Sequence, residues 1–225
     1  MSEHHSYSSD FVSHQVNGRE RQTATFLSRG FVTLSLRVAG LPPRHLHRWA
    51  ASFDPESMSQ QTQYKIRSLR PADQPLLWEM LYLSLFVPKG SAPFERDILE
   101  QPDISKYVCD WGRATDFGFV TVDENNQPLG AIWLRLLTGE EKGYGYVDDF
   151  TPELGMAVFP EYRGRGIGTS LLTRLVETAA ASYEQISLSV ARENPALRLY
   201  KRFDFEVVAE NGSSLTMRKR LKARE

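Results

Sequence analysis

The stretch 158–169 holds the residues whose types and spacing most clearly imply chemistry. It closes a predicted strand and opens a predicted long helix, and between them stand three evenly spaced glycines: Gly164, Gly166 and Gly168. Glycines let backbone N–H groups come close to a ligand, and a helix start offers unpaired N–H donors and a positive dipole end. Arg163 and Arg165 add charge suited to phosphate. The pattern predicts a cradle for a pyrophosphate group.

Two common phosphate-binding loops do not fit this stretch. A dinucleotide-binding fingerprint would need a third glycine where Thr169 stands, and a P-loop would need a lysine before its Ser or Thr. The alternatives that remain are another type of pyrophosphate loop and a flexible surface turn with a solvated Arg-Gly-Arg.

The histidines limit the chemistry further. All five lie before residue 48, so the chain after residue 63 contains none. A Ser–His–Asp or Cys–His nucleophile and a histidine-ligated metal are therefore excluded there. Proton transfer must use Asp, Glu, Tyr, Lys, Cys or water. The single cysteine, Cys109, has no histidine available as a base in this part of the chain, and we expect a small buried hydrophobic residue rather than a nucleophile.

Several predicted elements must position these residues. Alternating or helical apolar spacing predicts strands at 64–70, 117–123, 129–137, 151–159, 186–191, 205–210 and 213–220, and helices at 72–87, 94–100, 103–111, 165–183 and 195–203. Asp103 is the expected N-cap of its helix. This order predicts a mixed α/β fold with one central strand–helix–strand unit.

Residues 1–57 differ from the rest in composition, since the first lysine is Lys65. Their one apolar stretch, 26–41, alternates and could form a strand. We expect a poorly ordered or non-native leader over 1–57 and one folded domain over 58–225. Met58 is an alternative start of the chain. A histidine metal site and an organellar transit peptide are less favoured readings of the leader.

The net charge of −1 gives no electrostatic reason for nucleic-acid or membrane binding. The longest uncharged run covers only 125–134, far short of the ~20 residues that a membrane-spanning helix needs. We therefore expect a cytoplasmic protein with no nucleic-acid partner, no membrane partner and no metal.

Two segments resemble a known family. ELGMAVFPEYRGRGIGTSLL, which contains Arg163, Gly166 and Gly168, looks like motif A of the GNAT acyl-CoA N-acyltransferases. ARENPALRLYKRFDFE, at 191–206, resembles motif B of the same family. The resemblance covers about 64–220. It implies a GNAT-like α/β fold: a mixed, mostly antiparallel central sheet with a splayed strand pair and flanking helices.

The resemblance also implies how acetyl-CoA, the cosubstrate, would be bound. The strand before the loop would pair with pantetheine through Met156, Ala157 and Val158. The pyrophosphate would lie on the loop and the helix start, formed by Arg163, Gly164, Arg165, Gly166, Ile167, Gly168 and Thr169. The asparagine of motif B, here Asn194, would contact the pantetheine arm.

The resemblance implies a catalytic tyrosine, Tyr200, that protonates the leaving thiolate. A carboxylate serves as base in many relatives, and Glu153 is favoured here by its position, with Asp148 and Asp149 as alternatives. Ser189 could orient a water. Two departures from the family pattern stand out. Asp204 replaces a usual glycine, which predicts an altered turn, and the spacing before Tyr200 is one residue shorter than in many members.

The acceptor would bind between the loops 86–97 and 138–150. An aromatic wall could come from Phe86, Phe94, Tyr144, Tyr146 and Phe150. The leading hypothesis is an N-acetyltransferase acting on an amine of a small molecule or peptide by direct attack in a ternary complex. A non-catalytic acyl-CoA-binding regulatory module and, more weakly, a nucleic-acid-binding module are the alternatives. A homodimer is left open.

Overall fold

The computed structural model describes residues 9–16, 19–26 and 63–221, and the chain divides into two compact units, Met1–Gln60 and Gln61–Glu225. In the first unit, β1 (Ser9–Val16) and β2 (Arg19–Phe26) pair antiparallel. The strand expected within 26–41 lies outside the described residues, except for its first position. The interpretation of 1–57 as a leader stays a prediction.

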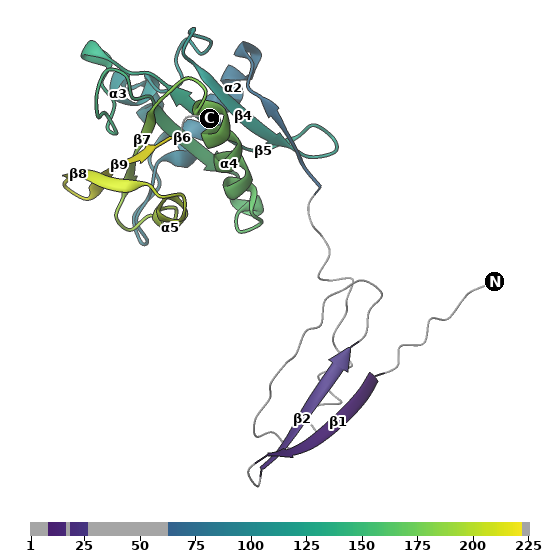
Figure 1. Cartoon of the computed structure of the whole chain (residues 1–225). Helices are drawn as coiled ribbons and strands as arrows, with labels where there is room; N and C mark the ends of the chain where they lie inside the picture. Colours follow the sequence, from purple (N-terminus) through teal and green to yellow (C-terminus); the bar gives the residue numbers. More distant parts are fainter. Residues whose placement is uncertain (1–8, 17–18, 27–62, 222–225) are drawn as a thin grey trace. The chain divides into compact units, whose positions relative to one another are not determined.

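The second unit is built on one seven-stranded sheet flanked by helices (Figure 1). Its strands are β3 (Lys65–Ser68), β4 (Phe117–Val122), β5 (Pro128–Arg135), β6 (Glu153–Val158), β7 (Gln185–Ala191), β8 (Glu206–Asn211) and β9 (Ser214–Arg220). Its helices are α2 (Gln74–Ser84), α3 (Pro102–Ser105), α4 (Ile167–Ala179) and α5 (Leu197–Arg202), with 3-10 turns η2 (Pro71–Asp73), η3 (Arg96–Glu100), η4 (Gly139–Glu141) and η5 (Pro160–Tyr162). The predicted order of strands and helices is confirmed, except that the helix predicted at 94–100 is the 3-10 turn η3.

The strands lie in the order β3-β4-β5-β6-β7-β9-β8. Every neighbouring pair is antiparallel except β6 and β7, which are parallel and joined by the α4 crossover. Their register contains a single pair, Glu153 opposite Ser187. The mixed, mostly antiparallel sheet with a splayed strand pair is therefore confirmed.

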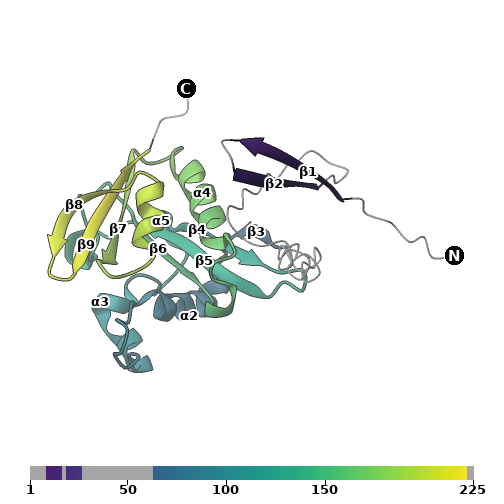
Figure 2. The ribbon, with the colours of Figure 1, turned by 90° about the horizontal axis from the view of Figure 1, so that it is seen from below.

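Alternating strand residues supply two separate cores, one on each face of the sheet. Phe119 and Ile132 pack with α4 and α5, whereas their neighbours Val120 and Trp133 pack with α2 and the α3 region. Figure 2 shows α4 and α5 on one side of the sheet and α2 and α3 on the other. The segment that carries the predicted cradle thus lies on the α4 side.

The helix predicted at 103–111 is much shorter, and its predicted cap is wrong. α3 ends at Ser105, its N-cap is Gln101, and Asp103 instead pairs with Lys106 at 2.9 Å. The chain does not continue as a helix to residue 111, since Asp110 has a left-handed φ of 53°, and the buried guanidinium of Arg135 on β5 binds the carbonyls of Lys106 and Cys109 beyond the end of α3.

The prediction for Cys109 is also wrong in part. The side chain is only half-buried, and its thiol lies 3.5 Å from the Asp110 carboxylate. Burial and the nearby carboxylate raise the pKa of this thiol, so the residue is not activated as a nucleophile. Within the described residues, no helix is long and apolar enough to cross a membrane.

Candidate active site

The turn between β6 and α4 presents a row of backbone N–H groups. Gly164 and Gly166 have φ angles of 75° and 83°, a left-handed conformation that glycine adopts without the steric cost met by other residues. From here into the first turn of α4, several N–H groups find no acceptor within residues 63–221: those of Gly164, Gly166, Ile167, Gly168 and Thr169. Such a row of donors at a helix start suits an anion.

Arg163 and Arg165 are both exposed, and each donates a hydrogen bond to a backbone carbonyl just before or within this turn. The Nε of Arg163 donates to the carbonyl of Val158 at 2.9 Å. The guanidinium of Arg165 donates to the carbonyl of Glu161 at 3.0 Å and lies 5.5 Å from the centre of the Tyr162 ring. Their positive charges therefore stand beside the N–H row.

The edge of β6 that faces β7 is open beyond its first residue. Ser187 donates its N–H to the carbonyl of Pro152 at 3.0 Å, and no further β7 pairing occurs in the described sheet. Met156, Ala157 and Val158 pair with β5 along their other edge only. An unpaired strand edge can bind an extended ligand through its backbone, and here the edge leads directly into the glycine turn.

The two residues predicted on α5 have different surroundings. The Oδ1 of Asn194 accepts the N–H of Ala196 at 2.9 Å, in the turn just before α5. Tyr200 is buried among apolar side chains, with its ring edge-on to Phe205 at 5.7 Å. Its hydroxyl makes no hydrogen bond to the described residues, and burial raises its pKa.

Glu153 begins β6 on the opposite face of the sheet from Leu154 and is only 3% exposed. Its Oε2 accepts hydrogen bonds from the hydroxyl of Tyr107 at 2.9 Å and from the N–H of Gly145 at 2.8 Å. Its Oε1 is buried without a partner among the described residues. Burial raises the pKa of Glu153, and the two hydrogen bonds oppose that rise.

Comparison with known proteins decides the family. A model of the acetyltransferase (GNAT) family matches residues 77–205, which span more than half of the chain and include the glycine turn and α5. The chain belongs to the GNAT acetyltransferase family. No curated protein sequence matches it.

Solved GNAT structures share this fold. The ribosomal-protein-S18-alanine N-acetyltransferase from Escherichia coli aligns at 15% identity over 72% of this chain and 97% of that one, with a TM-score of 0.50. A spermidine N-acetyltransferase from Vibrio cholerae in complex with CoA and spermine aligns at 22% identity over 70% and 95% of the two chains, with a TM-score of 0.47. At these identities the likeness concerns the fold.

The loops expected to bind the acceptor in this GNAT chain carry partly exposed aromatic rings. Phe94, Tyr144 and Phe150 are exposed, Phe150 to 84%. The hydroxyl of Tyr82 donates to the carbonyl of Phe94 at 2.7 Å, which fixes one loop to α2. The hydroxyl of Tyr146 donates to the Asp149 carboxylate at 2.9 Å.

The carboxylate of the alternative base Asp148 is already engaged by several hydrogen bonds. It accepts hydrogen bonds from Phe150, from the hydroxyl of Thr151 and from the side chain of Gln185, and these contacts lower its pKa. Asp149 holds Tyr146. Ser189 lies on β7, half-buried, near Gly145.

Sequence reasoning missed Tyr107, because no motif marks a tyrosine 46 positions before the carboxylate it binds.

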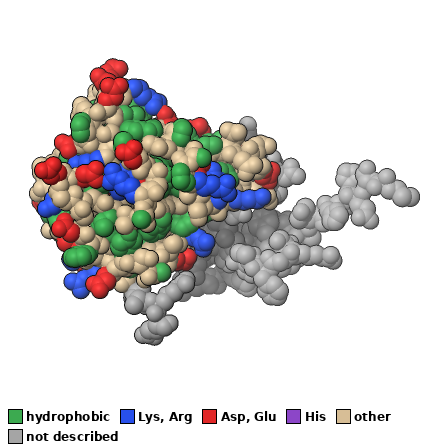
Figure 3. Space-filling model, turned by 90° about the horizontal axis from the view of Figure 1, so that it is seen from above, with side chains coloured by type: hydrophobic (Ala, Val, Ile, Leu, Met, Phe, Trp, Pro, Cys, Tyr) green, Lys and Arg blue, Asp and Glu red, His purple; other side chains and the backbone are tan. Residues whose placement is uncertain are grey.

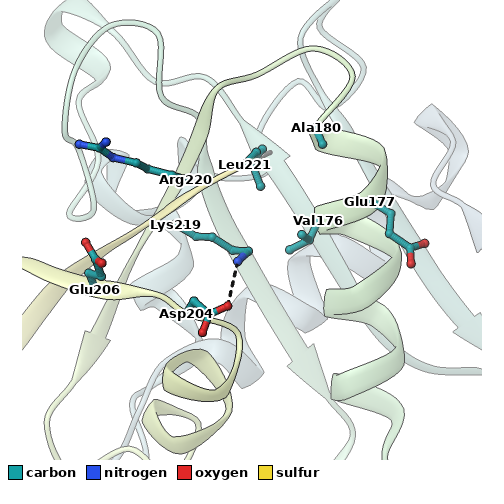
Figure 4. A pocket seen from close by; sticks show the side chains of 8 residues that line it. All are labelled: Val176, Glu177, Ala180, Asp204, Glu206, Lys219, Arg220 and Leu221. Atoms are coloured by element: carbon teal, nitrogen blue, oxygen red, sulfur yellow. Dashed lines mark ion pairs between the residues drawn. The ribbon is translucent and has the colours of Figure 1, made fainter. Parts of the chain in front are cut away.

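A shallow hollow of about 560 Å³ lies away from these residues, between the C-terminal part of α4 and strands β8 and β9. Figure 4 shows Asp204 and Lys219 pointing toward one another across it, with 3.7 Å between their charged atoms. Asp204 has a φ of 59°, a left-handed conformation that Asp tolerates better than most residues. The hollow contains no residue that the sequence assigns to the cofactor or to catalysis.

The surface of the GNAT domain shows mixed charge. On the face seen in Figure 3, acidic and basic side chains are interspersed with apolar ones. This face therefore lacks the one-signed patch that nucleic-acid binding uses.

Proposed function

We propose that this GNAT protein is a cytoplasmic enzyme that transfers an acetyl group from acetyl-CoA to an amine of a small molecule or peptide. The attack is direct, in a ternary complex, with no covalent enzyme intermediate. The observation that carries the proposal is the open edge of β6, which runs into the glycine N–H groups of the turn, for which residues 63–221 offer no acceptor. Together they suit a ligand with an extended amide arm and a pyrophosphate.

The residues present fit acetyl-CoA because their free groups complement its polar groups. The backbone of Met156, Ala157 and Val158 can pair with the pantetheine amides, and the side-chain nitrogen of Asn194 remains available to them. The N–H groups of the turn match phosphate oxygens. Bound acetyl-CoA would supply the thioester carbonyl that the amine attacks.

Tyr200 is proposed as the general acid. Its burial keeps the hydroxyl protonated at neutral pH, so a proton is present for the leaving sulfur. The hydroxyl has no partner in the described residues, so no existing hydrogen bond competes for that proton.

Glu153 is proposed as the general base. Its carboxylate is too deeply buried for direct contact with a bulky acceptor, so a water molecule relays the proton from the amine. Ionised Glu153 then takes the proton, and its elevated pKa makes it a better proton acceptor than an exposed glutamate.

The experiment is a free-thiol release assay on the full chain, with acetyl-CoA and a panel of amines, amino acids, antibiotics and peptide N-termini. We expect turnover with at least one amine, and calorimetry should show acetyl-CoA binding. Absence of binding at millimolar acetyl-CoA contradicts the proposal. Binding without turnover supports instead a regulatory acyl-CoA-binding module.

Tyr200→Phe tests the proposed acid. Loss of the proton donor should lower kcat by about 10²-fold or more, with the calorimetric Kd for acetyl-CoA unchanged. A variant with unchanged kcat removes Tyr200 from the mechanism.

A further inference from the structure

Tyr107 is a partly buried, titratable side chain that the proposed mechanism does not use. It lies just after α3, and its hydroxyl oxygen is 2.9 Å from the Oε2 of Glu153. Burial and the neighbouring charge of Glu153 raise the pKa of Tyr107. The phenol therefore stays neutral and can act only as a hydrogen-bonding group.

The direction of the Tyr107 hydrogen bond is fixed by a second contact. The N–H of Tyr144 donates to the hydroxyl oxygen of Tyr107 at 2.7 Å. Because that oxygen already accepts a hydrogen, its own proton is directed to Glu153. A hydroxyl bonded in this way stabilises the ionised carboxylate more than the protonated one.

The Glu153 carboxylate is also held sterically. The α-carbon of Gly143 packs so closely on the carboxylate and on the Tyr107 hydroxyl that a Cβ there would overlap both. The N–H of Gly145 binds the same Oε2 that Tyr107 binds. The loop therefore closes over the carboxylate, with Oε1 left as the oxygen that makes no hydrogen bond to the described residues.

The backbone around Tyr107 is held in place by the buried guanidinium of Arg135. The guanidinium of Arg135, which is paired with Asp116, donates to the carbonyls of Lys106 and Cys109 on either side of it. The tyrosine thus sits in a turn whose backbone is fixed at two points. Its position relative to β6 does not depend on loop contacts alone.

The other charged groups that face Glu153 are few. The ammonium of Lys106, from the Tyr107 turn, favours the ionised carboxylate. Arg135 on β5 stands opposite Glu153 in the register, but its charge is neutralised by Asp116. On the other side Ser187 lies opposite Glu153, and Arg218 on β9 lies opposite Ser187.

We propose that Tyr107 is a positioning residue for the general base: its hydroxyl holds Oε2 of Glu153 and keeps the carboxylate ionised and in place, so that Glu153 can take up the proton of the acceptor amine. This inference rests on the proposed function, because it assigns Tyr107 a role only if Glu153 is the base. Tyr107 touches neither substrate nor cofactor in this scheme.

The test is the pH profile of kcat/KM for the acceptor, measured at saturating acetyl-CoA on the full chain with Tyr107→Phe. Loss of one donor to the carboxylate should move the acidic limb upward by about one pH unit, with the acetyl-CoA Kd unchanged. The matched control is Tyr183→Phe, which removes a tyrosine hydroxyl whose one hydrogen bond within residues 63–221 goes to the carbonyl of Thr115, at 3.5 Å. Since both variants use the same amine, its own ionisation cancels in the comparison.

A superimposable acidic limb in Tyr107→Phe and Tyr183→Phe overturns the inference. If Tyr107→Phe does not fold, replacing Tyr107 by 3-fluorotyrosine keeps its size but makes the hydroxyl a stronger donor. The acidic limb should then move downward, and an unmoved limb overturns the inference equally.

Glu153→Gln separates this inference from the proposed function. We expect its rate to fall by about 10²-fold or more, as for the loss of a general base. Full turnover by Glu153→Gln refutes the assignment of Glu153 as base and with it the role of Tyr107, but leaves the proposed acetyl transfer standing; absence of turnover by the wild type refutes the proposed function instead. A loss of turnover in Glu153→Gln combined with an unmoved limb in Tyr107→Phe refutes only the role of Tyr107.

Discussion

Asp116→Asn removes the negative charge from a fully buried ion pair without changing the shape of the side chain. Asp116 and Arg135 are both 0% exposed and form a two-point contact, with N–O distances of 2.6 and 3.0 Å. The guanidinium also donates to the carbonyls of Lys106, Cys109 and Asp110 at 2.8, 2.6 and 3.3 Å. The variant leaves the arginine charge buried with neutral acceptors only, these carbonyls and the amide oxygen of the new asparagine.

The magnitude follows from that geometry. Breaking a buried pair by removing one partner costs about 3–5 kcal/mol, and the three remaining carbonyl acceptors place this case near 3. For a domain of this size, about 3 kcal/mol corresponds to a fall in Tm of roughly 6–12 °C. An exposed pair of the same chemistry provides the control: Arg96 and Glu79 also make a two-point contact, at 2.5 and 3.0 Å, but are 59% and 33% exposed. Glu79→Gln should cost less than about 1 kcal/mol.

Urea unfolding of the two variants and the wild type gives both free energies directly. The reasoning is refuted if Asp116→Asn destabilises the protein no more than Glu79→Gln does. A linked functional effect is also expected: since Arg135 fixes the turn that carries Tyr107, Asp116→Asn should lower kcat even at temperatures where the domain stays folded.

Two further predictions concern the glycine turn and acid stability. Gly166→Ala forces a Cβ into the left-handed region at a cost of about 1–2 kcal/mol and should weaken acetyl-CoA binding in calorimetry. Gly168→Ala, whose Cβ would lie 3.6 Å from its nearest neighbour, should retain full stability, and equal losses in the two variants would contradict the argument. The hydrogen bond from Arg67 lowers the pKa of Asp73, so this carboxylate stabilises the fold above its unfolded pKa of about 3.9, and the contribution disappears as pH falls through the lowered value. Asp73→Asn should therefore be less stable than wild type at pH 7, and the two should converge on acidification; a constant gap in their unfolding free energies would speak against it.

The glycine turn and α4 could be predicted because their signals are local. Positive-φ glycines, the apolar period of the helix and the preceding strand all lie within one short stretch, so neighbouring residues alone specify the structure. Strand alternation likewise predicted the sheet. The end of α3 could not be predicted this way, because the turn that follows it is held by Arg135, far along the chain in β5, through the carbonyls of Lys106 and Cys109.

The surroundings of Glu153 show the same limit at the candidate site. The sequence pattern predicts that Glu153 lies at a strand. The burial of Glu153, however, depends on the loop that contains Gly143 and Gly145, which folds back over the carboxylate. The hydrogen bond between Glu153 and Tyr107 joins two residues that are 46 positions apart in the chain, with β4 and β5 between them. Such contacts arise from sheet register and loop closure, which the sequence pattern does not reveal.

The single rung between β6 and β7 divides the sheet into two antiparallel halves, β3-β4-β5-β6 and β7-β9-β8, that share little backbone hydrogen bonding. A ligand bound in the gap would act as a short additional strand, and its contacts with both halves would hold them together. Folding and cofactor loading would then be one coupled equilibrium, since any species that binds only the native state stabilises it by mass action. The free energy of unfolding of this enzyme would thus rise with the acetyl-CoA concentration around it, and the protein would be less stable where acetyl-CoA is scarce.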